Sequence, residues 1–303
     1  MNFLNKIIIK SLPYIPKILV KVFSKRYVAG INNREALHAV KTLNTNNLYT
    51  TIDILGEHTL NNKQCTAITN NYLELLDLIK EKDLKCNLSI KPSHIGLDIN
   101  FKTVLSNFSK ITDKAKELNN FIRIDMESST STDESIKLYN KLRQKDKNIG
   151  IVFQAYLKRT EADIKKLNNS SNIRLCKGIY NESEKIAFKN PDKINDNFLK
   201  LLEIIFKKGI YVGIATHDTV LINSAIKLIN KMNISNDKFE FQYLHGVPMD
   251  HMVKTYKQSG FKTRVYVPFG KNWYDYSIRR VKENPQIATY VLKNIFLSKN
   301  NKQ

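Results

Sequence analysis

The alternation of short apolar runs with longer segments of helical spacing, from residue 50 onward, most constrains what this chain can fold into. The intervening segments repeat apolar residues at helical intervals, as in Leu73, Leu76 and Ile79. Alternating strands and helices form a parallel sheet with right-handed crossovers. Eight runs have the length and the β-branched or aromatic content of strands: 51–56, 86–91, 121–126, 149–156, 172–177, 211–216, 239–244 and 262–267.

Two α/β architectures fit this rhythm. Eight strand–helix units over about 250 residues match a TIM-type (β/α)8 barrel. An open, doubly wound sheet is the alternative, and it normally carries a Gly-rich turn after its first strand. Here that turn reads Gly56-Glu57-His58-Thr59, with a single glycine. The sequence therefore favours the barrel.

The amino-terminal part of the chain lacks the rhythm. We therefore expect residues 1–50 to form an extra helical segment and residues 51–303 to form the barrel. Residues 1–28 are basic and amphipathic, and lysines and prolines interrupt their apolar runs, which does not fit a secretory signal. A packed amphipathic helix is the expectation here, and a helix lying on a membrane surface is the alternative.

The charge balance bears on possible partners. Lys and Arg number 49 against 28 acidic residues, a net charge of +21, which suits nucleic acid or an anionic membrane. However, only nine of the 49 are Arg, and no basic run reaches five residues. Because an aromatic–basic array is also missing, we expect no nucleic-acid partner and ascribe the surplus to a bias toward Lys.

Cysteine content and hydropathy indicate the compartment. The three cysteines form no CxxC pair, which is typical of a reducing compartment such as the cytoplasm. No apolar run approaches the roughly 18 residues of a membrane span. We therefore predict a cytoplasmic protein, with peripheral contact at the inner face of the cell membrane as the alternative that residues 1–28 leave open.

Polar residues lie at the ends of seven of the eight predicted strands. In a (β/α)8 barrel the carboxyl ends of the strands form the active site. Isolated buried charges are costly, so the convergence of many polar groups at one rim predicts an enzyme. These groups are Lys91, Asp125, Gln154, Arg174, Lys177, Thr216, His217, Glu240, Gln242, Arg264 and Tyr266.

The charges at this rim favour an anionic ligand. Acidic and histidine residues there are candidate metal ligands, but Lys91, Arg174 and Lys177 would repel a dication, so we predict no metal site. Cys176 has no evident histidine partner, and a GxSxG motif is missing, which argues against a nucleophilic mechanism. Gly178 would let the backbone approach a phosphate closely.

Two adjacent arginines, Arg279 and Arg280, follow the last predicted strand on a helix expected to begin near Trp273. Neighbouring helical residues point about 100° apart, so both can face one ligand only if this helix lies across the barrel mouth. Such a pair predicts a clamp for a substrate carboxylate, because guanidinium groups bind carboxylates in a bidentate way.

An ordered set of motifs resembles the proline dehydrogenase family. Each piece is weak alone, but the set follows the order and spacing of the family from Lys91 to the end of the chain. The matching segments are Arg123-Ile-Asp-Met-Glu-Ser128, Gln154-Ala-Tyr156, Arg174-Leu-Cys-Lys-Gly178, Thr216-His-Asp218, Phe239-Glu-Phe-Gln242, Arg264-Val-Tyr-Val-Pro268 and Trp273-Tyr-Asp-Tyr276 with Arg279-Arg280.

The resemblance implies a monofunctional bacterial enzyme with a distorted (β/α)8 barrel that binds FAD at its carboxyl-terminal rim. It implies oxidation of L-proline to Δ1-pyrroline-5-carboxylate, the first step of proline degradation, with electrons passed to a quinone. Asp125 and Arg174 match catalytic positions. Lys91, Tyr266, Arg279 and Arg280 match substrate contacts. The positions that match FAD contacts are Met126, Gln154, Lys177, Gly178, Ile179, Thr216 and His217.

Two other functions remain open at this point. A different flavin-dependent barrel reductase, similar to methylenetetrahydrofolate reductase, would share the fold and the cofactor without needing the paired arginines. A basic nucleic-acid-binding module would be colourless and would bind phosphates with a steep salt dependence. An absorption spectrum separates the flavin enzymes from the nucleic-acid module, because only the former carry a coloured cofactor.

Overall fold

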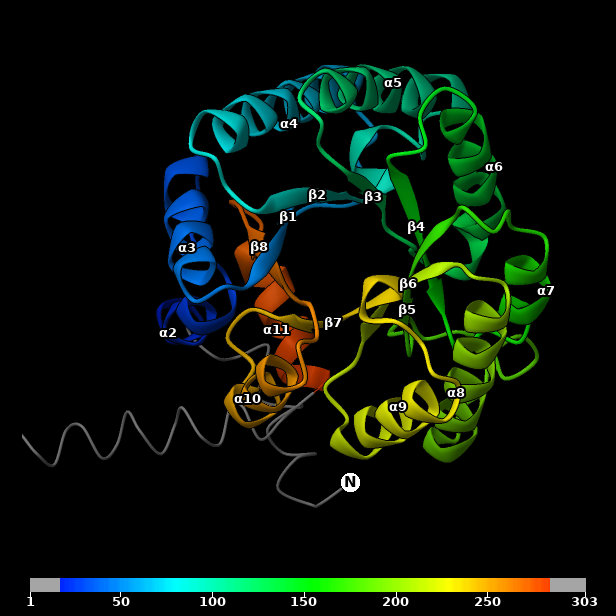
Figure 1. Ribbon diagram of the computed structural model, residues 1–303. Coiled ribbons are helices and arrows are strands. Elements are labelled where there is room, and N and C mark those ends of the chain that lie inside the picture. The colour runs from blue at the N-terminus through cyan, green and yellow to red at the C-terminus, as the bar shows by residue number, and fades with distance from the viewer. Residues whose placement is uncertain (1–16, 284–303) are drawn as a thin grey trace, which may run out of the picture.

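A computed structural model describes residues 17–283, and Figure 1 shows the strands closed into a ring with helices around them. The strands follow one another in chain order around a closed, fully parallel barrel. All eight predicted strands are found. Their bounds are β1 Tyr49–Ile54, β2 Cys86–Ile90, β3 Ile122–Ile124, β4 Ile149–Gln154, β5 Asn172–Cys176, β6 Tyr211–Ala215, β7 Phe239–Leu244 and β8 Thr263–Phe269.

The helices between the strands form the outer ring of Figure 1. Several begin at an Asn or Asp whose side chain accepts a hydrogen bond from a backbone N–H of the first turn, as at Asn61, Asn100, Asn190 and Asp218. The helices of this ring are α3 Asn33–Thr45, α4 Asn62–Glu81, α5 Phe101–Glu117, α6 Thr132–Arg143, α7 Thr160–Lys165, α8 Pro191–Lys207, α9 Thr219–Lys231 and α10 Asp250–Gln258.

Short 3₁₀ segments complete the loops at Pro92–Ile95, Ser129–Ser131 and Asn236–Lys238. Within the described part of the chain, no helix combines the length and apolar character that a membrane span requires.

The apolar core lies between the strands and the surrounding helices. Alternate residues of each strand point outward, and those of β8, for example, are Val265 and Val267. They pack on apolar helix faces such as Phe198, Leu201 and Ile205 of α8. The burial of this layer supplies the main driving force for closing the barrel.

The inside of the barrel is polar, whereas barrels of this type are usually filled by layers of Val, Ile and Leu. The inward-facing positions of the strands carry charged and amide side chains that hydrogen-bond across the barrel. Nearly all of them are buried. They include Asp53, Asn87, Ser89, Arg123, Arg174, Glu240, Gln242 and Arg264.

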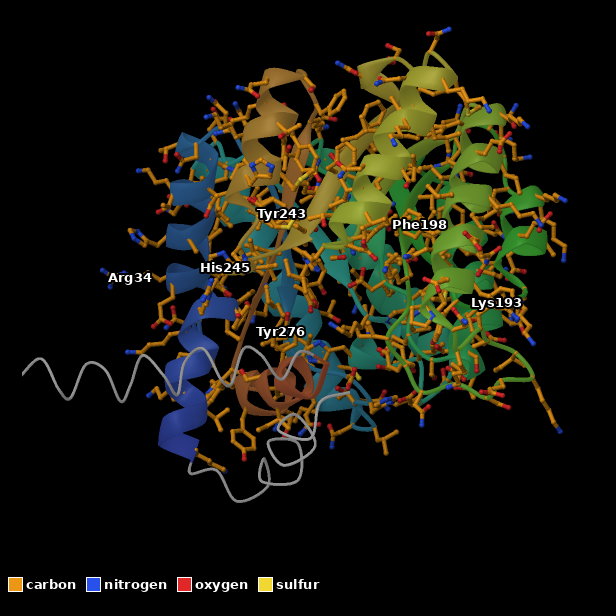
Figure 2. The ribbon with its side chains drawn as sticks, turned by 90° about the horizontal axis from the view of Figure 1, so that it is seen from below. Arg34, Lys193, Phe198, Tyr243, His245 and Tyr276 are labelled. Atoms are coloured by element: carbon orange, nitrogen blue, oxygen red, sulfur yellow. The ribbon has the colours of Figure 1, made fainter. Side chains whose placement is uncertain are left out.

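Helix α11, Trp273–Glu283, begins where the sequence predicted. Figure 2 shows it viewed roughly along its axis at one end of the barrel, and Figure 1 shows it beside β8 within the ring of helices. Tyr276 packs against Leu55, the residue that follows β1, so α11 lies against the carboxyl ends of the strands. This is the position that the predicted clamp requires.

Helix α2, Lys17–Tyr27, supports α11 from outside the barrel. Tyr27 and Val28 pack with Leu55 and Tyr276, and the Arg26 Nε atom donates a hydrogen bond to the carbonyl oxygen of Gly246 at 2.9 Å. Part of the basic amphipathic segment is therefore a packed helix. Its first sixteen residues lie outside the described part of the chain.

Candidate active site

The centre of the site is a buried ion pair between Asp125 and Arg174. Asp125 directly follows β3, and Arg174 lies in the middle of β5, so the closed barrel brings them together. The Arg174 Nη1 atom is 2.8 Å from Asp125 Oδ1, and Ser89 Oγ donates to the same oxygen at 2.5 Å. The aromatic ring of Tyr266 lies under the guanidinium, 5.2 Å from it, and its hydroxyl donates to Asp125 Oδ2 at 3.1 Å.

Tyr266 is suited to donate rather than to ionise. Burial and the Asp125 and Asp53 carboxylates raise the pKa of its phenol well above the usual value, so it keeps its proton at neutral pH. The phenol therefore fixes the second oxygen of Asp125 while the ring forms part of the wall of the site.

A second buried pair joins Lys91, at the end of β2, to Asp53 of β1. Their Nζ and Oδ2 atoms are 2.5 Å apart, and the Asp53 side chain is 1% exposed. Burial favours the neutral amine, but the Asp53 and Asp125 carboxylates outweigh it and keep the pKa of Lys91 above its ordinary value. Lys91 therefore offers a permanent positive charge near Asp125, as expected for a group that binds an anion.

Deeper in the barrel, Arg264 and Glu240 form a third pair. The Arg264 Nε and Nη2 atoms lie 2.7 and 3.1 Å from the two carboxylate oxygens of Glu240. The prediction that both residues lie at the rim was wrong, because each is the second residue of its strand and Arg264 pairs in register with Tyr49, the first residue of β1. They lie in the amino-terminal half of the barrel, beneath the site.

Sequence reasoning missed Asp53 and Ser89, which both contact predicted site residues directly. Each is a polar residue at an inward-facing position of a predicted strand, and this was the signal that could have identified them. Glu127, two residues after Asp125, accepts hydrogen bonds from both the backbone N–H and the hydroxyl of Ser93. Through these two hydrogen bonds Glu127 holds the loop after β2 in place.

The residues predicted to bind a cofactor lie at the end of β4 or in the loops after β3, β5 and β6. Gln154 Nε2 donates to the carbonyl oxygen of Met126 at 3.4 Å, Lys177 Nζ lies 2.6 Å from Asp218 Oδ2, and His217 Nε2 accepts a hydrogen bond from the backbone of Leu244. Thr216, in the same loop, is buried. Ile179 follows β5 and is 55% exposed, an unusual position for a large apolar side chain.

Two buried polar side-chain atoms of the predicted catalytic and cofactor residues have no hydrogen-bond partner among the described residues: Arg174 Nη2 and Gln154 Oε1. Unsatisfied buried groups are costly, and in native proteins they usually have a partner. One of these atoms is a donor and the other an acceptor. A polar planar ligand that both donates and accepts hydrogen bonds would satisfy them, and this is the chemistry of a flavin ring edge.

Gly178 lies where the backbone and the Tyr156 ring leave no room for a side chain. Its φ of +107° lies in the region that disfavours side chains, and a Cβ there would come within 2.1 Å of the Tyr156 ring. Only glycine therefore suits the turn after β5.

Other chemistries find less support in the described residues. No cluster of three or more His, Cys, Asp or Glu side chains suited to a metal occurs between residues 17 and 283. Burial raises the pKa of the Cys176 thiol to about 12, which keeps it protonated and unreactive. The side chains of Arg279 and Arg280, predicted to bind substrate, lie outside the described ones, although their backbone belongs to α11.

Known proteins are similar to this chain both in sequence and in fold. The model of the family described as Proline dehydrogenase matches residues 36–292. Proline dehydrogenase 1 of Bacillus subtilis (strain 168) is 34% identical over 273 residues, which cover 90% of each chain. Proline dehydrogenase of Deinococcus radiodurans is 32% identical over 278 residues, which cover 90% of this chain and 89% of that protein.

Among solved structures, proline utilization A (PutA) from Bdellovibrio bacteriovorus, inactivated by N-propargylglycine, superposes with a TM-score of 0.81 at 24% identity. The match covers 87% of this chain and 33% of that longer chain, so the two share this barrel. Together with the sequence relatives, these matches show that the chain belongs to the proline dehydrogenase family of oxidoreductases.

Proposed function

We propose that this protein oxidises L-proline to Δ1-pyrroline-5-carboxylate with FAD as its cofactor and a quinone as the final electron acceptor. The observation that supports this most directly is the buried Asp125–Arg174 pair, together with Arg174 Nη2 and Gln154 Oε1, which have no hydrogen-bond partner within residues 17–283. The proposed cofactor site is completed by residues in the loops after β3, β5 and β6, which are Met126, Lys177, Gly178, Ile179, Thr216 and His217.

FAD, when bound, supplies the acceptor for the hydride that leaves the ring carbon beside the proline nitrogen. Arg174 contributes a fixed positive charge where negative charge builds up during this transfer. Its position costs no reorganisation at that moment, because Asp125 and Ser89 already hold it. Asp125 touches Arg174 and Tyr266, and its proposed role is to orient these two groups.

Four residues are proposed to bind the substrate. Lys91 and the pair Arg279 and Arg280 would bind the carboxylate, and Tyr266 would line the wall against the five-membered ring. Lys91 is partly accessible, with its side chain 15% exposed, whereas its partner Asp53 is enclosed. Lys91 can therefore bind a ligand that enters from the rim, while the Asp53 carboxylate beneath it balances its charge.

An absorption experiment tests the proposed function. The purified protein is expected to be yellow, to release its flavin into the supernatant on acid precipitation, and to bleach when L-proline is added without oxygen. A soluble quinone should then restore the colour. A colourless protein would favour the nucleic-acid module, and a coloured protein that proline does not bleach would favour a different flavin reductase.

We further propose a cytoplasmic location with peripheral contact at the inner face of the membrane, where a lipid-dissolved quinone would be met. The free thiols of Cys65, Cys86 and Cys176 agree with a reducing compartment, and Lys17, Lys21 and Lys25 of α2 are exposed. Each lysine near an anionic surface contributes about 1 kcal/mol.

Binding to vesicles that contain phosphatidylserine is therefore expected to weaken as salt is raised. It is also expected to weaken when these three lysines are changed to glutamine, while neutral vesicles should bind little in either case. Binding that does not respond to salt would limit α2 to its packing role.

A further inference from the structure

The guanidinium of Arg174 is held from two directions. Its Nη1 atom donates to Asp125 and Ser89 at 2.8 and 3.0 Å, toward β2 and β3. Its Nε atom donates to Gln242 Oε1 at 2.6 Å, on the opposite side, toward β7. These contacts leave Nη2 without a protein partner among the described residues. The contacts with Asp125 and Ser89 belong to the candidate active site, whereas the contact with Gln242 is not part of the proposed function.

The amide of Gln242 can take only one orientation here. Arg174 Nε is always a donor and therefore requires the oxygen of the amide. On the other side, Gln242 Nε2 lies 2.6 Å from Glu240 Oε1, which as a carboxylate can only accept. A residue at 242 must therefore accept from one neighbour and donate to the other, which a glutamine does and a leucine or an ionised glutamate does not.

Glu240 is itself fixed in its ionised form. Burial opposes ionisation, but Arg264 outweighs it and lowers the pKa of the Glu240 carboxyl to about 2. Arg264 is anchored in turn by Asn87 Oδ1 at 2.6 Å and by the carbonyl oxygen of Thr50 at 2.8 Å. The chain of contacts from Arg264 through Glu240 to Gln242 thus connects the floor of the barrel to Arg174.

The neighbouring strand leaves room for this amide. Gly213 of β6 lies beside β7, and a Cβ there would come within 2.3 Å of Gln242 Nε2. An alanine at this position would displace the amide without changing its chemistry. The lack of a side chain at Gly213 therefore leaves the space that the Gln242 amide occupies.

We propose that Gln242 is a positioning residue that sets the orientation of Arg174, and that Glu240 fixes the orientation of the Gln242 amide. The inference rests on the proposed function, since the orientation of Arg174 matters for the oxidation of proline. Gln242 acts through Arg174 and does not itself touch the reacting atoms.

The first test needs no substrate and uses thermal unfolding of Gln242→Leu, Arg174→Lys and the double variant. Gln242→Leu leaves Arg174 Nε without an acceptor and is expected to lower the Tm by about 5 °C. In the Arg174→Lys background the Nε donor is gone, so the same change is expected to cost clearly less. Losses that simply add would overturn the proposed contact.

The second test compares turnover with Tm. Gln242→Leu is expected to lower kcat for proline about 10- to 100-fold, the usual effect of losing a hydrogen bond to a charged group. It should cause little further loss in the Arg174→Lys background. Gln242→Glu keeps an acceptor for Arg174 but places a second carboxylate against Glu240, so it should recover most of kcat while its Tm falls.

Asn120→Leu is the matched control. It removes a 3.0 Å hydrogen bond of an amide side chain, from Asn120 Nδ2 to the carbonyl oxygen of Cys86, at the amino-terminal end of the barrel. It is expected to lower the Tm and to leave kcat within about twofold, since distant sites act independently. If Gln242→Glu does not fold, Gly213→Ala supplies an independent test: it displaces the amide without changing its chemistry and is expected to reduce kcat as Gln242→Leu does.

The outcomes separate positioning from a structural role. If kcat follows Tm across all variants, or if Gln242→Leu keeps wild-type kcat, the proposal is wrong. A wild-type protein that fails to oxidise proline would contradict the proposed function alone, because the unfolding experiment still decides whether Gln242 holds Arg174.

Discussion

Replacing Arg174 by lysine is expected to reduce turnover with L-proline by about 10²-fold or more, the usual effect of losing one preorganised donor in an active site. The single Nζ atom of a lysine can still pair with Asp125. It cannot also reach Gln242 and leave a third donor free, as the guanidinium does with Nε, Nη1 and Nη2. The variant should therefore fold and bind flavin but transfer the hydride slowly.

Rapid mixing of the oxidised variant with proline under anaerobic conditions measures this step directly, and the midpoint potential of the bound flavin should be more negative than in the wild type. Arg143→Lys is the matched control. Arg143 lies on the outer helix α6 and donates to the carbonyl oxygen of Lys147, away from the site. An unchanged reductive rate in Arg174→Lys would remove Arg174 from the mechanism.

Changing Arg279 or Arg280 to methionine is expected to raise the KM for proline roughly 30-fold or more, because truncating one side of a buried charge pair costs at least about 2 kcal/mol. Helix α11 lies against the carboxyl ends of the strands and places the backbone of both residues there. The carboxylate is remote from the transferred hydride, so its binding is nearly uniform along the reaction and kcat should change less than KM.

Lysine in place of either arginine should recover only part of the loss, because it lacks the bidentate fork. Flavin content should stay near normal in all these variants, and Arg143→Met is again the control. A wild-type KM in both methionine variants would make the pair a surface feature and would weaken the assignment of proline as substrate.

Much of the fold could be predicted from the sequence because two signals are strong: the short apolar runs of the strands and the helical spacing of apolar residues between them. Each strand of the barrel matches a short apolar run, and β3 is shorter than predicted because the chain leaves the sheet at Asp125. The single glycine in the turn after β1 favoured the barrel over the competing open sheet, and the closed parallel sheet confirms the barrel. Alternation along the strands could also have indicated that Asp53 and Ser89 face inward.

Depth inside the barrel could not be predicted in this way. How far along the axis a residue lies depends on the stagger between strands, which the sequence does not reveal. Arg264 and Tyr266 are two residues apart on β8, yet the first pairs with Glu240 in the floor and the second with Asp125 in the site. For the same reason, the ion pair between Asp53 and Lys91 could be identified only from the register of the closed sheet.

The polar interior also affects how the barrel assembles. Arg264 finds its acceptors at Thr50 and Asn87, which are 214 and 177 residues away along the chain, and Arg174 reaches Ser89 over 85 residues. A partly assembled barrel would leave these guanidinium groups without some of their acceptors, because the contacts form only when distant strands meet. We therefore expect closure between the first and last strands to be a late, cooperative event of folding. The hydrogen bonds that position Arg174 in the site are therefore complete only when the whole ring of strands has formed.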